Sequence, residues 1–128
     1  AAIANGGTMM KPYLVKEIRN ITGKLIYEAS PKEFKNTMSP LTAKKITDLM
    51  VSDVESPKGT GKKARVLGLK VAGKTGTSGG GGILNAWFIT FAPADNPKYA
   101  IAILGDGEGK GMTVAAPIAA DIYKALIK

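Results

Sequence analysis

The segment from Val71 to Thr77 carries the side chains best suited to bind an anionic ligand. It reads Val-Ala-Gly-Lys-Thr-Gly-Thr, which offers one ammonium group and two hydroxyl groups around a glycine. These groups can donate hydrogen bonds to a carboxylate or a phosphate. The chain contains no histidine and no cysteine, so Ser-His-Asp catalysis and thiolate chemistry are excluded. Metal ligands are limited to carboxylates, and acid–base chemistry to lysine, tyrosine or a carboxylate.

The same residues satisfy a phosphate-loop pattern, which gives one interpretation of the segment. Gly68 to Thr75 matches G-x-x-x-x-G-K-[ST]. That motif works when a loop after a strand leads into a helix whose N-terminus faces the phosphates. Here Leu-Lys-Val-Ala favours an extended segment, and Gly-Thr-Ser before four glycines is a poor helix start. Nucleotide binding is therefore kept as an alternative, which predicts magnesium-dependent binding of ATP or GTP.

A second interpretation places the segment on a strand beside a cleft. The Lys-Thr-Gly element of serine transpeptidases and β-lactamases has this form. Lys74 and Thr75 or Thr77 could then bind a substrate carboxylate, and Gly76 would let the substrate backbone pair with the strand. Three residues recur by chance, so the remainder of the chain must support this interpretation.

The surrounding pattern predicts strands and helices that would hold such a segment. Strands are expected over residues 70–78, 85–92 and 99–104, and a hairpin over 13–18 and 23–27. Ser39 and Pro40 are typical of a helix start, and that helix should end near Ser56-Pro57. A last helix is expected over 114–127. The sequence therefore predicts an α+β fold in which helices flank an antiparallel sheet.

Apolar spacing predicts which helix faces pack inward. In the first helix the candidates are Leu41, Ile46, Leu49, Met50 and Val54, and in the last helix Ile118, Ile122, Ala125 and Leu126. Trp87 and Phe88 are both expected to be core residues of a strand next to the Lys-Thr-Gly segment.

Several other features have simple structural interpretations. Residues 1–5 read as the last turn of a helix closed by Gly6 or Gly7. Gly79 to Gly82 is either a natural mobile loop or an artificial linker that replaced a longer one. The Lys62, Lys63 and Arg65 group is expected to be a solvated charged loop, and Asp106 to Gly109 a plain turn without calcium.

Short segments along nearly the whole chain resemble the transpeptidase domain of class B, or monofunctional, penicillin-binding proteins. They occur in the order of that family: Ala1–Gly7, Met10–Pro12, Gly59–Gly61, Gly73–Thr77, Ala86–Phe88, Phe91–Pro97 and Ala115–Ala119. On this resemblance, residues 1–128 form the C-terminal portion of such a domain, a partial serine transpeptidase fold.

The resemblance implies a role in cross-linking peptidoglycan and covalent inhibition by β-lactams. Lys74, Thr75, Gly76 and Thr77 would bind the substrate or drug, no cofactor or metal would be required, and the domain would lie on the extracytoplasmic face of the bacterial membrane. The partners would be peptidoglycan stem peptides and β-lactams, with no nucleic acid.

Two active-site elements of that family do not occur in this sequence. No serine has lysine three residues later, as S-x-x-K requires, and no serine has asparagine two residues later, as S-x-N requires. We therefore expect no catalytic nucleophile in this chain, no activity of the chain alone, and missing N-terminal strands and nucleophile helix. An isolated chain is expected to close its incomplete sheet by dimerisation or strand exchange.

The net charge of the chain suggests one further alternative for its function. The 18 basic and 10 acidic residues give a formal net charge of +8, which would suit a non-catalytic module that binds polyanions. No apolar run reaches the roughly 18 residues of a membrane span. Sparse aromatic residues and the lack of a nucleic-acid-binding motif favour an ordinary basic surface.

Overall fold

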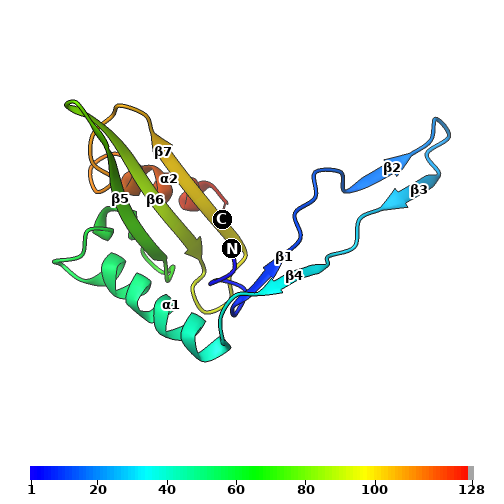
Figure 1. Ribbon diagram of the computed structural model, residues 1–128, viewed down its shortest axis with the longest axis horizontal. Coiled ribbons are helices and arrows are strands. Elements are labelled where there is room, and N and C mark those ends of the chain that lie inside the picture. Colours follow the sequence, from blue (N-terminus) through cyan, green and yellow to red (C-terminus); the bar gives the residue numbers. More distant parts are fainter. Residues whose placement is uncertain (127–128) are drawn as a thin grey trace.

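The computed structural model describes residues 1–126 and has two parts, a sheet with two helices and a protruding arm (Figure 1). The sheet contains β5 (Ala72–Gly80), β6 (Ile83–Ala92) and β7 (Tyr99–Gly105), all antiparallel and ordered β5-β6-β7. The helices are α1 (Pro40–Glu55) and α2 (Ala115–Leu126). The predicted α+β architecture is confirmed. Compared with the predicted strands, β5 begins and ends two residues later, β6 begins two residues earlier, and β7 ends one residue later.

The arm is a long two-stranded ribbon that extends away from the sheet. Its base pairs β1 (Thr8–Met10) with β4 (Glu33–Asn36), and its outer part pairs β2 (Glu17–Arg19) with β3 (Leu25–Glu28). The turn at its tip is fixed by the Asn20 side chain, which accepts hydrogen bonds from the backbone N–H groups of Thr22 and Lys24. The predicted hairpin is therefore present, but its strands are shorter than the predicted 13–18 and 23–27. At its root, residues 2–7 form turns that end with Gly6 and Gly7 at positive φ, in agreement with the expected glycine closure.

The capping residues of helix α1 determine where it begins and ends. Ser39 Oγ accepts a hydrogen bond from the Thr42 backbone N–H at 3.1 Å, which caps the first turn. Pro40 occupies the first helical position, where its missing N–H costs nothing. Ser56 closes the other end by donating its backbone N–H to the Ser52 carbonyl.

The buried face of α1 differs from the apolar stripe expected from sequence. Ala43, Met50 and Val54 are buried, whereas Leu41 and Leu49 are 64% and 72% exposed, so the inclusion of those two leucines was wrong. The buried residues lie on the side that meets the β5 edge. Met50 packs with Ala72 and Phe91, and Val54 with Phe88, so contacts with the sheet decide which apolar residues of α1 are buried.

The buried face of helix α2 also differs from the apolar stripe expected from sequence. The side that covers the sheet consists of small residues and one tyrosine: Ala115, Ala116, Ala119, Ala120 and Tyr123. Ile118 and Leu126 are 43% and 45% exposed and Ala125 is also exposed, so of the predicted stripe only Ile122 packs against the core. Alanine allows close packing of helix on sheet, while the larger Ile118 and Leu126 remain on the outer side.

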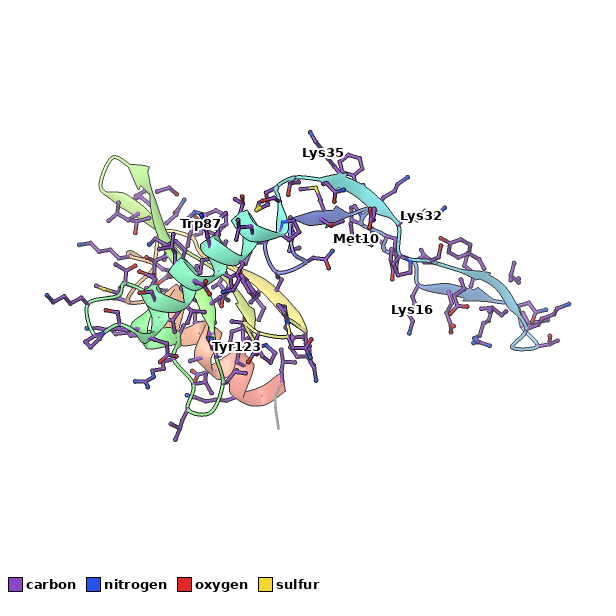
Figure 2. All side chains as sticks on the ribbon, turned by 90° about the horizontal axis from the view of Figure 1, so that it is seen from below. Met10, Lys16, Lys32, Lys35, Trp87 and Tyr123 are labelled. Atoms are coloured by element: carbon purple, nitrogen blue, oxygen red, sulfur yellow. The ribbon has the colours of Figure 1, made fainter. Side chains whose placement is uncertain are left out.

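The main core lies between α2 and one face of the sheet. Phe88, Ala86, Ala92 and Ile103 from the strands pack there with Val54 of α1 and Tyr123 of α2. Figure 2 shows Tyr123 on α2 beneath the sheet. The opposite face is only partly covered, because Ile89 and Leu104 remain 47% and 50% exposed.

The four-glycine segment is a tight hairpin connection. Gly79 and Gly80 belong to β5 and pair with Leu84 and Ile83. Gly81 and Gly82 form the turn with φ of +62° and +87°, and a two-residue type I′ turn requires positive φ at both positions. The glycines therefore have a defined backbone role in joining β5 to β6.

Candidate functional site

The Lys-Thr-Gly segment lies on β5, the outer strand of the sheet. Successive strand side chains point to opposite faces, so Lys74 and Gly76 share one face while Gly73, Thr75 and Thr77 share the other. Gly73 lies against the core, since a Cβ atom there would overlap the Phe88 ring. The segment therefore has a buried start and an exposed continuation, with Lys74 and Thr77 exposed and Thr75 half-buried.

Lys74 holds its ammonium group beside the outer edge of β5. Nζ lies 3.2 Å from Thr75 Oγ1 and 3.3 Å from the Thr75 carbonyl oxygen. It also lies 3.1 Å from Thr60 Oγ1, and the Thr60 and Thr75 hydroxyl oxygens are 2.6 Å apart. One ammonium and two hydroxyls thus form a compact polar group at the outer edge of the sheet, where an extended ligand could pair with the backbone.

Thr60 reaches β5 because its loop is held against the end of α1. The loop runs from Pro57 to Gly61, and the Thr60 backbone N–H and hydroxyl both bond to the Asp53 carboxylate. Gly59 and Gly61 leave no room for a side chain, since a Cβ at Gly59 would overlap the Asp53 carbonyl. A Cβ atom at Gly61 would lie 3.0 Å from Oδ2 of the Asp53 carboxylate. The two glycines therefore permit the close approach that brings Thr60 to Lys74.

Asp53 and Thr60 are the members of this group that the sequence analysis did not identify as functional. Asp53 Oδ2 lies 3.9 Å from Lys74 Nζ, and its side chain is 17% exposed. The two glycines around Thr60 signal a tight loop, but the partner that the loop packs against is not evident from spacing.

Trp87 and Phe88 occupy different environments although they are neighbours in sequence. Phe88 is fully buried, as expected. Trp87 is only half-buried and lies opposite Gly76 on the open face, where its indole N–H donates to Ser78 Oγ at 3.1 Å (Figure 2). The expectation that both residues are core therefore needs correction for Trp87, because adjacent strand residues face opposite sides.

The other charged residues near this segment bond elsewhere. Lys62 donates to the Pro57 carbonyl, and Arg65 pairs with Glu55 at 2.9 Å. Lys62 and Lys63 lie in the short 3₁₀ helix η1 (Lys62–Ala64) and are exposed, in agreement with a solvated charged segment. Asp106 and Gly107 form the expected turn. Among residues 1–126, no group of three or more metal-ligating side chains could hold a metal ion.

The phosphate-loop interpretation is wrong, because the element that follows Thr75 is a strand. Gly68 is followed by an extended segment, and β5 continues from Ala72 through Gly80 without a helix. No helix N-terminus can therefore face a phosphate bound at Lys74. The polyanion interpretation gains no support from the arm, where Lys32 and Lys35 project to the opposite side from Lys16 (Figure 2). No helix within residues 1–126 is long and apolar enough to cross a membrane.

Comparison with known proteins identifies one family over nearly the whole chain. Residues 1–124 match the penicillin binding protein transpeptidase domain. The peptidoglycan D,D-transpeptidase PbpA of Mycolicibacterium smegmatis is 37% identical over 92% of this chain and 26% of its own length. The stage V sporulation protein D of Bacillus subtilis is 39% identical over 97% of this chain and 21% of its own. This chain thus spans about a quarter of the length of these relatives.

Solved structures agree with this assignment. Penicillin-binding protein A from Mycobacterium tuberculosis, in its ceftriaxone acyl-enzyme complex, superposes with a TM-score of 0.89 at 33% identity, over 99% of this chain and 30% of that one. The D,D-transpeptidase domain of the peptidoglycan glycosyltransferase from Eggerthella lenta gives a TM-score of 0.88 at 35% identity, over 98% of this chain and 29% of that one. The shared fold extends over both the sheet and the arm.

Proposed function

Because the chain belongs to the penicillin-binding protein transpeptidase family, we propose that it forms one wall of the ligand site of a longer peptidoglycan D,D-transpeptidase. In this proposal residues 1–128 are the C-terminal portion of the domain. The observation that carries the proposal is the cluster at the outer edge of β5, where the Lys74 ammonium and the Thr75 hydroxyl meet at the Thr60 hydroxyl oxygen.

The cluster suits the terminal carboxylate of a peptidoglycan stem peptide, or the equivalent carboxylate of a β-lactam. Lys74 supplies the charge, and the hydroxyls of Thr75 and Thr77 can rotate to donate hydrogen bonds to the carboxylate. Gly76 has no side chain, so the ligand backbone can lie close to the strand at this position. These four residues are our proposed binding residues, and they require no cofactor or metal.

The catalytic serine is proposed to come from outside these 128 residues, since no serine here has the S-x-x-K or S-x-N spacing. That serine would attack the carbonyl carbon of the D-Ala-D-Ala bond and release the terminal D-alanine, leaving an acyl-enzyme for transfer. A β-lactam would acylate the same serine and remain attached. The positive charge of Lys74 would favour both reactions by binding the ligand carboxylate.

The reaction implies a location, and the exposed apolar face of the sheet suggests a state of assembly; we also propose both. Stem peptides are cross-linked outside the cytoplasm, so the domain would lie on the extracytoplasmic face of the bacterial membrane. The exposed Ile89 and Leu104 support dimerisation or strand exchange of an isolated chain. Light scattering after size-exclusion chromatography tests this assembly, and a purely monomeric chain would count against it.

Intact mass after incubation with benzylpenicillin tests the proposed function. The complete transpeptidase, which carries these residues together with S-x-x-K and S-x-N segments, should gain the mass of one drug molecule. Residues 1–128 alone should gain none. An adduct on the isolated chain, or none on the complete protein, would overturn the proposal.

A further inference from the structure

Asp53 is the residue on which the polar cluster at β5 converges. It lies near the end of α1, and its carboxylate accepts from both donors of Thr60, the backbone N–H and the hydroxyl, whose proton is shared by the two carboxylate oxygens. The backbone N–H donates at 3.1 Å to Oδ1, and the hydroxyl lies 3.0 Å from each carboxylate oxygen. The Asp53 carbonyl also accepts from the Gly61 N–H at 3.2 Å. The loop is therefore fixed to α1 through both the backbone and the side chain of one residue.

The carboxylate also determines the direction of the hydrogen bonds in the cluster. A carboxylate can only accept, so the single hydroxyl proton of Thr60 points to Asp53. The Thr60 oxygen must then accept from Lys74 Nζ at 3.1 Å and from the Thr75 hydroxyl at 2.6 Å. Both lone pairs of that oxygen are used. In the absence of a ligand, Asp53 thus directs the donors of Lys74 and Thr75 toward Thr60.

We propose that Asp53 is a positioning residue for ligand binding by Lys74 and Thr75, acting through Thr60. The inference rests on the function proposed above but concerns a residue outside the Lys-Thr-Gly segment. The Asp53–Thr60 contact holds the ammonium of Lys74 at the edge of β5, where a ligand carboxylate would meet it. The negative charge of Asp53, 3.9 Å from Nζ, meanwhile competes with that carboxylate for the same ammonium.

These two effects of Asp53 have opposite signs and can be separated by substitution. Asp53→Asn retains an acceptor for Thr60 but removes the charge. Asp53→Ala removes both, so the loop loses its anchor. Thr60→Val keeps the shape of the side chain but removes the hydroxyl that contacts Lys74. Asp48→Asn serves as the control, because Asp48 lies on the same helix but is exposed and pairs with Lys44 at 2.7 Å.

The experiment measures acylation of the complete transpeptidase by benzylpenicillin and separates the dissociation constant before acylation from the acylation rate constant. Asp53→Ala and Thr60→Val should each raise the dissociation constant about tenfold, as expected for loss of one hydrogen bond to a charged group. The rate constant should change less. Asp53→Asn should bind at least as tightly as the unmodified protein, and Asp48→Asn should bind equally.

Different outcomes separate this inference from the proposed function. An unmodified protein that is not acylated would overturn both. An unmodified protein that is acylated, with dissociation constants unchanged in Asp53→Ala and Thr60→Val, would overturn only the role of Asp53. Equal losses in Asp53→Asn and Asp53→Ala would also overturn it. Thr60→Val keeps the test valid if Asp53→Ala does not fold, since it leaves α1 intact.

Discussion

The hydroxyl oxygen of Thr60 lies 2.6 Å from that of Thr75, although the two residues are 15 positions apart in the chain. Thr60 comes from the loop after α1, and Thr75 from the outer strand of the sheet. Lys74 Nζ lies within 3.2 Å of both oxygens. The strand that carries the proposed binding residues is therefore supported by the helix that precedes it, and changes in either element should affect the same polar group.

Lys74 should contribute more to ligand binding than its charge alone would. In the complete transpeptidase, Lys74→Ala should slow acylation by benzylpenicillin by at least about tenfold, because it removes a charge-assisted hydrogen bond at the site. The matched variant is Lys70→Ala, which removes the same charge from an exposed position just before β5. Equal losses in the two variants would mean that only the overall positive potential matters. The second-order acylation rate constant is the quantity to compare.

Gly73 should tolerate no larger residue. A Cβ atom there would overlap the Phe88 ring, so Gly73→Ala should lower the free energy of unfolding by about 1–3 kcal/mol. Gly80→Ala is the control, since nothing lies within 4 Å of a Cβ at that position. Denaturant unfolding followed by the fluorescence of the single tryptophan, Trp87, measures both. A loss as large in Gly80→Ala would show that backbone flexibility decides the result.

The hairpin turn should accept asparagine but not a β-branched residue at Gly81. Asn-Gly is strongly preferred in type I′ turns, so Gly81→Asn should leave stability equal or improve it. Gly81→Val should cost about 1–2 kcal/mol, because φ is +62° at this position and valine is strained there. If residues 79–82 behaved as a mobile loop, neither substitution would change the unfolding free energy.

The buried face of α1 can be tested with two adjacent residues. Met50 is 7% exposed and Leu49 is 72% exposed. Met50→Ala should lower the unfolding free energy by about 2–5 kcal/mol, because it leaves a cavity between the helix and the sheet. Leu49→Ala should change it by less than about 0.5 kcal/mol. The reverse order would mean that α1 presents its more hydrophobic stripe to the core.

Tyr123 should make stability depend on pH in the alkaline range. Burial raises the pKa of Tyr123 above its ordinary value of 10.0, and the hydrogen bond to Thr90 partly offsets this rise. The unfolded tyrosine therefore ionises before the folded one, so its contribution is fully present below pH 10 and is lost as pH rises through the folded pKa.

Comparison with Tyr123→Phe isolates this contribution from the titration of lysines. Below pH 10 the variant should be less stable by about 1 kcal/mol, because the bond to Thr90 is lost. Above pH 10 the difference between the two proteins should shrink. A difference that stayed constant through the alkaline range would falsify the link between burial and ionisation.

Local signals predicted both helices, the three strands of the sheet and the hairpin at the tip of the arm, but not β1 and β4 at its base. The cap at Ser39, the proline at position 40 and the strand-like segment around Lys74 depend on interactions within a few residues, and each was found as predicted. The resemblance to the transpeptidase family also followed from sequence, because it rests on short motifs in a set order. The missing S-x-x-K pattern is likewise a property of the sequence.

Only the tertiary structure decided which surfaces meet. Which of Leu49 and Met50 is buried depends on how α1 packs beside the sheet, and which of Trp87 and Phe88 faces the core depends on which face of the sheet α2 covers. Alanine and glycine permit close packing without adding hydrophobicity. Asp53, Thr60 and Lys74 meet because α1 packs beside β5. Their hydrogen bonds join segments that are distant in the chain, so no local spacing could predict them.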